Sequence, residues 1–316
     1  MNGMIGYIAR RLLFAVLLVF AVSSASLVLA RLAPGDFVAE SLGVTARREQ
    51  IEAARERYGL NRPFGEQYRA WLAGAVRLDF GRSMQYDRPV TEIIPQRALN
   101  SALLAISALV LATLIGLPLG VVTGTRRSGV LPAAIRGVSL ILLSLPPLLT
   151  SLFLVFVAAK SGALPVGGMT SASGGELLRH MIVPVAALAL PLAAMFERLQ
   201  SQAMSETVGQ PFVLATFARG VPIGRVLWRD ALKNALRPVA SIYGLVVGTL
   251  LSGSFAVEVI TAWPGLGGLM LGALRARDVY LVAGCAAAGS LFLAIGTLLS
   301  DAMLAIVDPR IAHDRP

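Results

Sequence analysis

The chain has 316 residues, of which 56% are hydrophobic and 15% charged, and its mean hydropathy is +0.71. A water-soluble fold of this size would have too little polar surface to cover its core, so the composition predicts a polytopic membrane protein. The net charge of +10 does not indicate nucleic-acid binding, because the arginines lie at the ends of apolar runs and no nucleic-acid motif accompanies them. The single cysteine, Cys285, excludes an intrachain disulfide framework.

Six stretches of the chain are long and apolar enough to cross a bilayer, for which about 20 residues of helix are needed. They are interpreted as helices because a helix satisfies its own backbone groups in lipid. The predicted spans cover residues 8–30, 98–125, 131–159, 181–200, 238–258 and 279–307.

Prolines interrupt two of these predicted spans. The Pro146–Pro147 pair predicts a distortion of the third span. Pro184 and Pro191 predict a kink in the fourth, which we expect to continue beyond Glu197 toward the cytoplasm.

The cations of the short loops predict the orientation of the chain. With a cytoplasmic N-terminus, the inside cations are Arg10, Arg11, Arg126, Arg127, the five of residues 210–238, Arg310 and Arg315. The outside short loops then carry only Lys160, Arg179, Arg275 and Arg277. The excess of cations on the inside predicts that both termini are cytoplasmic.

Residues 31–97 form a long segment that this orientation places outside. Two helices are predicted in it, over residues 46–58 and 64–77. Tyr68, Trp71 and Leu72 share a face of the second helix, which could pack against the outer helix ends, rest on the membrane surface or receive a partner.

Residues 210–238 form a basic, helix-competent insert between the fourth and fifth predicted spans. Its cations are Arg219, Arg225, Arg229, Lys233 and Arg237. Gly220, Pro222 and Gly224 break it into two short helices joined by a turn, and glycine at 220 permits that turn. Such a cytoplasmic loop indicates binding of a partner protein; the alternative is a positive loop that only anchors topology.

Residues 259–278 form the loop between the last two predicted spans. Pro264, Gly265, Gly267 and Gly268 favour a re-entrant or tight hairpin, and Trp263 is expected to be an interfacial anchor. At its start, Glu258 could face a transport pathway or pair with Arg275 or Arg277. Asp301, in the last span, is expected to be a structural partner for a cytoplasmic arginine.

The lysines and histidines indicate no enzyme chemistry. Neither Lys160 nor Lys233 completes the GxxxxGK[ST] phosphate-binding pattern, so we expect no ATP site in this chain. His180 and His313 lie far from any Ser/His or metal constellation.

Seven motifs follow one another along the chain. They are LAPGD (32–36), QIEAARERYGLNRP (50–63), DFGRSMQYDRPV (79–90), GLPLGVVTG (116–124), FARGVPIGRVLWRDALKNALRP (217–238), VEVITAWPGLGGLM (257–270) and DPRI (308–311). Together they resemble the permease subunit of dipeptide/oligopeptide/nickel-type ABC importers, in particular the member with the larger external segment between helices 1 and 2. The resemblance extends over residues 1–311.

The resemblance implies an all-α, six-helix type I ABC importer permease fold in the bacterial inner membrane. The implied divisions are a cytoplasmic N-terminus with helix 1 (1–30), an external subdomain (31–97), a core of helices 2–6 (98–308) with a coupling loop (205–237) and an outer hairpin (259–278), and a cytoplasmic tail (309–316). The implied partners are a second homologous permease, two ABC ATPase subunits that hold ATP and Mg, a solute-binding protein and membrane lipid. Peptides, nickel chelates, glutathione and opine-like compounds all stay open as substrates.

The resemblance also implies two sets of functional residues. The ATPase-coupling residues are Ala215, Arg219, Gly220, Arg225, Asn234 and Pro238, and the residues of the outer gate are Glu258, Trp263, Pro264, Gly265 and Gly267. Leu214, Thr216 and Phe217 depart from the family pattern, so the ATPase contact is expected to be more apolar here, unless Leu214 and Phe217 pack on the permease's own helix ends. The alternative function is an ion-gradient-driven secondary transporter.

Overall fold

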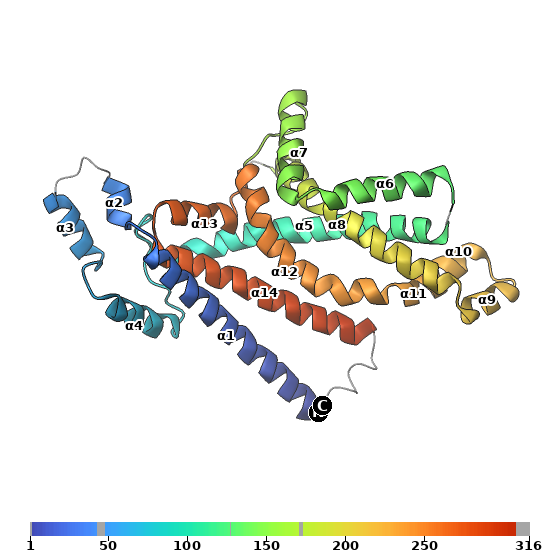
Figure 1. The fold of residues 1–316 in the computed structure, drawn as a ribbon, viewed down its shortest axis with the longest axis horizontal. Helices are drawn as coiled ribbons and strands as arrows, with labels where there is room; N and C mark the ends of the chain where they lie inside the picture. Colours follow the sequence, from blue (N-terminus) through green and yellow to red (C-terminus); the bar gives the residue numbers. More distant parts are fainter. Residues whose placement is uncertain (1, 43–47, 127, 171–172, 308–316) are drawn as a thin grey trace. The chain divides into compact units, whose positions relative to one another are not determined.

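A computed structural model gives the fold of the chain (Figure 1). It describes the backbone of residues 2–42, 48–126, 128–170 and 173–307, and their side chains except those of residues 2–5, 7, 8, 42, 249, 251–253 and 300–307. Within these ranges the chain forms helices, with one isolated antiparallel bridge between Arg82 and Pro89. The prediction of an all-α protein is confirmed.

The helices group into two compact units, Met1–Ser101 with Pro264–Ala294 and Ala102–Trp263 with Ile295–Pro316. The first unit holds α1 (Asn2–Leu32), α2 (Phe37–Leu42), α3 (Arg48–Arg57), α4 (Phe64–Ala75) and α13 (Leu266–Arg275). The second unit holds α6 (Val130–Ser144), α7 (Pro147–Ser161), α8 (Gly174–Val208), four short helices over residues 211–235, and α12 (Arg237–Ile260). Helices α5 (Val90–Thr125) and α14 (Val279–Val307) each begin in the first unit and end in the second.

Four helices of the described residues are long and apolar enough to cross a membrane. They are α1 over Ala9–Leu32, α5, α8, and α14 over Val279–Leu299, and the bent pair α6 and α7 would make a fifth span. Helix α12 coincides with the predicted span 238–258, but the side chains at 249 and 251–253 lie outside the described residues. The chain is therefore a polytopic membrane protein, and the number of six spans remains a prediction.

The third predicted span is broken rather than merely distorted. Helix α6 ends at Ser144, α7 begins at Pro147, and the two axes differ by 106° (Figure 1). Leu145 takes an extended conformation with ψ 119°, because a residue before proline is disfavoured from the helical region. Pro146 is also extended, with ψ 145°, and caps α7. The distortion predicted within residues 131–159 is therefore a complete break between two helices, and their crossing of the membrane as one span remains a prediction.

Helix α8 is central to the second unit and packs against α6, α7 and α12. It begins after Ser173, whose side chain accepts a hydrogen bond from the backbone N–H of Glu176. The helix then continues through Pro184 and Pro191 to Val208, so its predicted extension beyond Glu197 is confirmed.

A row of three glycines on α5 allows α8 to approach closely. A Cβ atom at Gly116 would lie 2.5 Å from the carbonyl oxygen of Ala193, and one at Gly124 would lie 2.4 Å from that of Ser201. Between them, a Cβ at Gly120 would lie 2.5 Å from the Cβ of Gln200. Small residues at this spacing are typical of helices packed backbone to backbone in membranes. The GLPLGVVTG motif is thus a packing face for α8.

The two helices predicted in the external segment are both present in the first unit. The prediction over 46–58 corresponds to α3, and Gly59, with φ +66°, follows its end. Asp36 accepts a hydrogen bond from the backbone N–H of Ala39 in α2 and forms an ion pair with Arg55 of α3 at 2.8 Å. The LAPGD motif therefore joins these two helices.

The aromatic face of α4 packs against other helices of the first unit. Trp71 is buried, and its indole N–H donates to the carbonyl oxygen of Phe80 at 3.2 Å. The hydroxyl oxygens of Tyr68 and Ser24, on α1, lie 2.6 Å apart. Trp71 also belongs to a buried cluster with Leu27 of α1 and Ala283 of α14. Of the three roles considered for this face, the structure shows packing.

Candidate functional site

The 210–238 segment folds as two helical arms joined by a tight turn. The first arm is α9 (Pro211–Ala218), and the second runs through α10 (Ile223–Arg225), a π-helical turn η1 (Val226–Ala231) and α11 (Leu232–Ala235) into α12. Gly220 lies in the turn with φ +78°, a backbone conformation that residues with a Cβ rarely adopt. The predicted helix, glycine turn and helix are therefore observed.

One side of this segment is fixed to the core of the second unit. Its buried residues form a single cluster with α5 and α8, consisting of Val121, Ala203, Met204, Val213, Val226, Ala231 and Ala235. Phe217 packs against the same cluster. Burial of these side chains holds both arms on the ends of α5 and α8.

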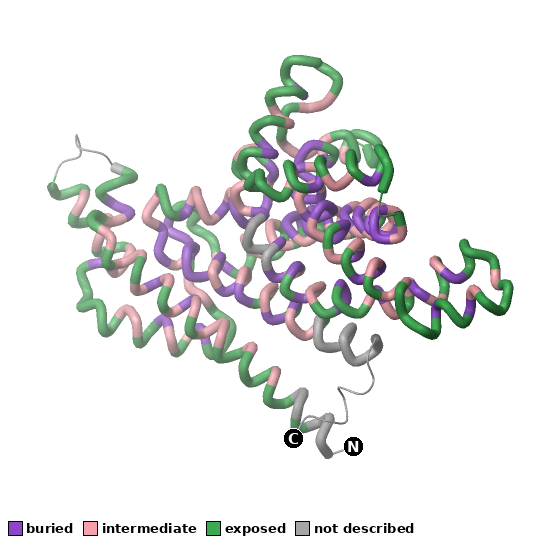
Figure 2. The backbone as a smooth tube through the Cα atoms, turned by 45° about the vertical axis from the view of Figure 1, so that its right-hand side comes forward, coloured by how far each residue is buried: buried purple, intermediate pink, exposed green. Residues whose placement is uncertain are grey.

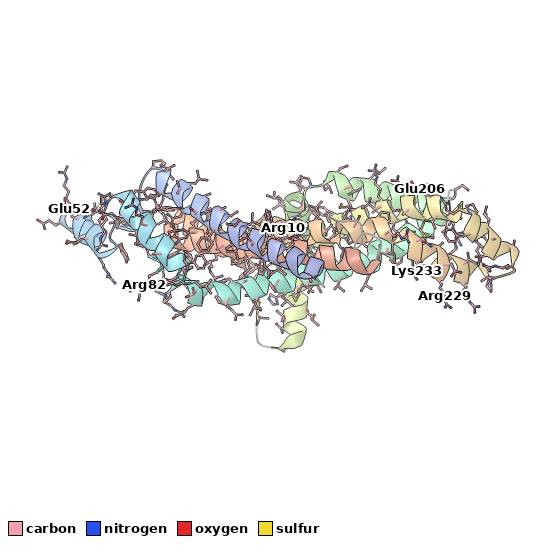
Figure 3. All side chains as sticks on the ribbon, turned by 90° about the horizontal axis from the view of Figure 1, so that it is seen from below. Arg10, Glu52, Arg82, Glu206, Arg229 and Lys233 are labelled. Carbon is pink, nitrogen blue, oxygen red and sulfur yellow. The ribbon has the colours of Figure 1, made fainter. Side chains whose placement is uncertain are left out.

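The other side of the segment exposes large apolar side chains. Phe212, Leu214, Ile223 and Trp228 are 44%, 55%, 67% and 51% exposed, respectively. In Figure 2 the tube of this segment, at the right-hand end, is mostly exposed, with short buried and intermediate stretches between. Arg229 and Lys233 are exposed on one side of it (Figure 3). An apolar surface rimmed by cations is typical of a protein-binding site.

The structure places the predicted coupling residues as follows. Ala215, Arg219, Arg225 and Pro238 are exposed, while Asn234 is half-buried and its side-chain amide donates to the carbonyl oxygen of Asp230 at 3.2 Å. The Arg219 guanidinium donates to the hydroxyl of Thr216 at 3.1 Å.

The two residues that depart from the family pattern differ in their environment. Leu214 is exposed, whereas Phe217 packs on the cluster that the segment shares with α5 and α8. Self-packing therefore accounts for Phe217 but not for Leu214.

In the second unit, a buried carboxylate and a buried indole lie at the start of the 259–278 loop. Glu258 is fully buried, and its Oε1 accepts a hydrogen bond from the hydroxyl of Ser254 at 3.1 Å. The backbone N–H of Trp263 donates to the carbonyl oxygen of Glu258. The Trp263 side chain is only 1% exposed. The expectation that Trp263 is an interfacial anchor is wrong, because its side chain has no surface left for lipid.

In the first unit, the 259–278 loop continues as the short helix α13. The backbone N–H of Leu266 donates to the hydroxyl of Ser101, and the Asn100 amide donates to the carbonyl oxygen of Pro264, both at 2.8 Å. Gly265 and Gly267 are buried. The 259–278 loop is thus a Pro/Gly-rich turn followed by a short helix. A role of this loop as a gate remains a prediction.

Asp278 is a buried residue that the sequence analysis did not single out. Its carboxylate accepts hydrogen bonds from the hydroxyl of Ser83 at 2.6 Å, the N–H of Gln85 at 3.0 Å and the N–H of Leu281 at 3.1 Å. Asp278 therefore caps α14 and binds the 83–85 segment to it. Aspartate immediately before an apolar helix is a capping signal that could have revealed half of this role.

Two further predictions concern Asp301 and the absence of a metal site. The side chain of Asp301 lies outside the described residues. No group of three or more His, Cys, Asp or Glu side chains in the described part of the chain is arranged to hold a metal ion.

Comparison with known proteins identifies the family. Residues 116–313 match the family described as "Binding-protein-dependent transport system inner membrane component", and residues 4–98 match the corresponding N-terminal family. The chain belongs to this family. It is accordingly a membrane permease subunit of an ABC importer.

Several relatives match over almost the whole chain. The Oligopeptide transport system permease protein AppB of Bacillus subtilis is 32% identical over 316 residues, which cover 98% of this chain and 100% of the relative. The Dipeptide transport system permease protein DppB of Escherichia coli K12 is 28% identical, with 99% and 100% covered. The Glutathione transport system permease protein GsiC of Shigella flexneri is 29% identical, with 98% and 100% covered.

Proposed function

We propose that this permease imports short peptides at the expense of ATP hydrolysed by partner subunits. The names of its full-length relatives support this substrate class, since they include oligopeptide and dipeptide permeases. An ion-gradient-driven secondary transporter is not favoured, because the family is binding-protein-dependent.

The assembly we propose contains a second homologous permease, two ABC ATPase subunits and an extracytoplasmic solute-binding protein. The two permeases together form the pathway, and this chain contributes one half of it. ATP and Mg are bound by the ATPases, which agrees with the lack of a GxxxxGK[ST] sequence in this chain.

The observation that carries the coupling proposal is the two-sided construction of the 210–238 segment. Its outer side presents Leu214, Ile223 and Trp228, and its inner side is buried with α5 and α8. A partner bound to the outer side can therefore act on the transmembrane helices through the inner side. We infer that ATP-driven closure of the ATPases moves this segment and exchanges the outer and inner gates.

The proposed membrane arrangement follows the predicted orientation. It has six spans in a type I importer fold, both termini in the cytoplasm, residues 31–97 outside, and the coupling loop 205–237 inside. The outer loop 259–278 would then lie at the outer mouth with Glu258, for which pathway contact and pairing with Arg275 or Arg277 both stay open.

Uptake by the reconstituted complex tests the function. Proteoliposomes that hold the permease pair and ATPases, with the binding protein added, should accumulate peptide only when ATP is supplied on the ATPase side. Dissipating proton and sodium gradients with ionophores should leave this uptake unchanged. Uptake that proceeds without ATP and stops with the ionophores would instead establish the secondary transporter.

A further inference from the structure

A cavity lined mostly by polar and charged residues lies within the second unit, between the C-terminal end of α5, α6 and α8. Its volume is about 580 Å³, within the range of small-molecule sites. The residues that matter for its chemistry are Thr123, Arg136, Ser139, Glu197, Arg198 and Ser201. None of them belongs to the coupling segment or to the outer loop.

The one acidic residue among the described residues that line the cavity is a buried glutamate. Glu197 is 2% exposed, and its Oε1 accepts a hydrogen bond from the Thr123 hydroxyl at 2.5 Å. No lysine, arginine or histidine nitrogen of the described residues forms an ion pair with it. A buried carboxylate is unfavourable without a cation, so this position suits the ammonium group of a ligand.

Cationic and hydroxyl groups line the same cavity as this carboxylate. Arg198 is exposed and lines the cavity. The Arg136 guanidinium, also in the lining, is oriented by a hydrogen bond to the carbonyl oxygen of Thr123 at 2.6 Å. The buried Ser139 hydroxyl has no hydrogen-bond partner among the described residues. The cavity thus combines a carboxylate, two guanidinium groups and a hydroxyl group that can hydrogen-bond a ligand.

A second buried polar side chain lies next to Glu197 on α8. Gln200, one helical turn further on, is fully buried, and neither its amide nitrogen nor its amide oxygen has a hydrogen-bond partner in the part of the chain that the structure describes. Buried polar groups are paired in almost all proteins, and polar groups at membrane depth are commonly functional. This part of α8 is therefore built for polar chemistry rather than for packing alone.

We propose that this cavity is a binding site for the terminal groups of a short zwitterionic peptide. The peptide's ammonium group binds Glu197, its carboxylate binds Arg198, and its main chain hydrogen-bonds Ser139 and Ser201. The assignment of the ligand rests on the proposed peptide transport. In the proposed orientation, the site lies toward the cytoplasmic ends of α5 and α8, where a peptide would leave the pathway.

An ethanolamine lipid headgroup shares the same pair of charges. Its acyl chains would need an extended apolar groove beside the charged groups. Of the residues that line this cavity, Leu140 and Leu143 carry apolar side chains, Gly124 contributes only backbone, and the other eight are polar or charged. The lining therefore favours a peptide, whose main chain needs hydrogen-bond partners along its length.

Protection of an introduced cysteine tests the site directly. Ser139→Cys is made in a Cys285→Ser background, and the permease–ATPase complex in nanodiscs is labelled with a maleimide. A mixture of di- to tetrapeptides with free termini should slow labelling. The N-acetylated mixture should need a concentration about tenfold higher, because it cannot form the charge-assisted hydrogen bond to Glu197.

Second variants separate binding from damage to the fold. Adding Glu197→Gln should raise about tenfold the concentration of free peptides that is needed to slow labelling. The free and the N-acetylated mixtures should then be needed at the same concentration. The matched control is Glu176→Gln, an exposed glutamate near the start of the same helix, and it should leave both values unchanged. A purely structural role for Glu197 would not remove the preference for a free amino group.

The outcomes distinguish this site from the proposed function. Peptide uptake by the wild type without peptide protection of Ser139→Cys would overturn the site and leave the function standing. Labelling that responds to the removal of phosphatidylethanolamine but not to peptide would show a lipid site and also overturn the proposal. Absence of any peptide uptake by the wild type would contradict the proposed function and this substrate assignment with it.

Discussion

Trp228 has an environment unlike that of the other two tryptophans. Trp71 and Trp263 are 5% and 1% exposed, whereas Trp228 is 51% exposed, in the π-helical turn η1 between Arg225 and Arg229. A half-exposed indole flanked by arginines has the composition of an interface hot spot. Trp228 is therefore the residue whose side chain we expect to contribute most to the ATPase contact.

Truncation of this side chain gives the prediction at the residue scale. Trp228→Ala should weaken binding of the ATPase subunits to the permease by about 30-fold, since hot-spot tryptophans contribute about 2 kcal/mol or more. Titration of labelled ATPase onto permease in nanodiscs measures the affinity. The control is Leu178→Ala, an exposed apolar residue near the opposite end of α8, which should bind as the wild type does. Equal affinities in Trp228→Ala and wild type would exclude Trp228 from the contact.

Single residues also show the limits of prediction from the sequence. Gly220 was predictable because a glycine between two helix-competent stretches has few other roles, and its φ of +78° agrees. The environments of Leu214 and Phe217 could not be predicted. Their helix α9, PFVLATFA, is apolar on nearly all sides, so no periodic pattern indicates which face is buried. Trp263 was misassigned because an indole beside a predicted span suits both a lipid-facing and a buried position.

The packing of α5 against α8 is the element-scale feature on which the cavity and the coupling segment both depend. The glycine row 116, 120 and 124 brings the two backbones together, and α8 then continues toward the coupling segment. A side chain at Gly120 must push the helices apart or displace Gln200 and the backbone of Glu197, and one at Gly116 or Gly124 meets the backbone of Ala193 or Ser201 in the same way.

Gly120→Ala tests this packing. The added Cβ would lie 2.5 Å from the Cβ of Gln200 and 2.7 Å from the carbonyl oxygen of Glu197, so the variant should lose about 1–3 kcal/mol of stability. Thermal unfolding of the purified permease in detergent should show a lower midpoint. Gly137→Ala, in α6 with no neighbour within 4 Å of the added Cβ, should not lower it. Equal midpoints for Gly120→Ala and wild type would show that α5 and α8 leave room for a methyl group at this position.

At the scale of elements, the positions of the helices were predictable and their interactions were not. Apolar length and loop cations located the predicted spans, because a bilayer imposes that length on any spanning helix. The break between α6 and α7 exceeded the predicted distortion, since two consecutive prolines remove helical geometry from Leu145 as well as from themselves. The roles of Thr123, Glu197 and Asp278 depend on contacts between distant segments, which no local pattern encodes.

The orientation of the whole chain is tested by single-cysteine labelling. In a Cys285→Ser background, a cysteine at Gln50 should react with a membrane-impermeant maleimide added from the outside, and one at Lys233 only from the inside. These outcomes follow from the excess of cations on the predicted inner loops. Labelling of position 50 only from the cytoplasmic side would overturn the six-span orientation.

The central claim for the assembled importer is that the 210–238 segment couples ATP hydrolysis to transport. A substitution at Gly220 tests this claim most directly. Valine at φ +78° is strongly disfavoured, by more than the roughly 1–2 kcal/mol that this region costs an ordinary L-residue. Gly220→Val should therefore distort the turn between the two arms. The matched control is Gly224→Val, because Gly224 lies in the short helix α10 and an added Cβ there meets nothing within 4 Å.

The measurement is solute-stimulated ATP hydrolysis together with peptide uptake by the reconstituted complex with its binding protein. Gly220→Val should insert and purify normally, because no spanning helix is altered, yet lose at least about 90% of both activities, as expected for a barrier or binding change of about 1.4 kcal/mol or more. Gly224→Val should retain both. Wild-type hydrolysis and uptake in Gly220→Val would contradict the account, and the 210–238 segment would then be only a topology anchor.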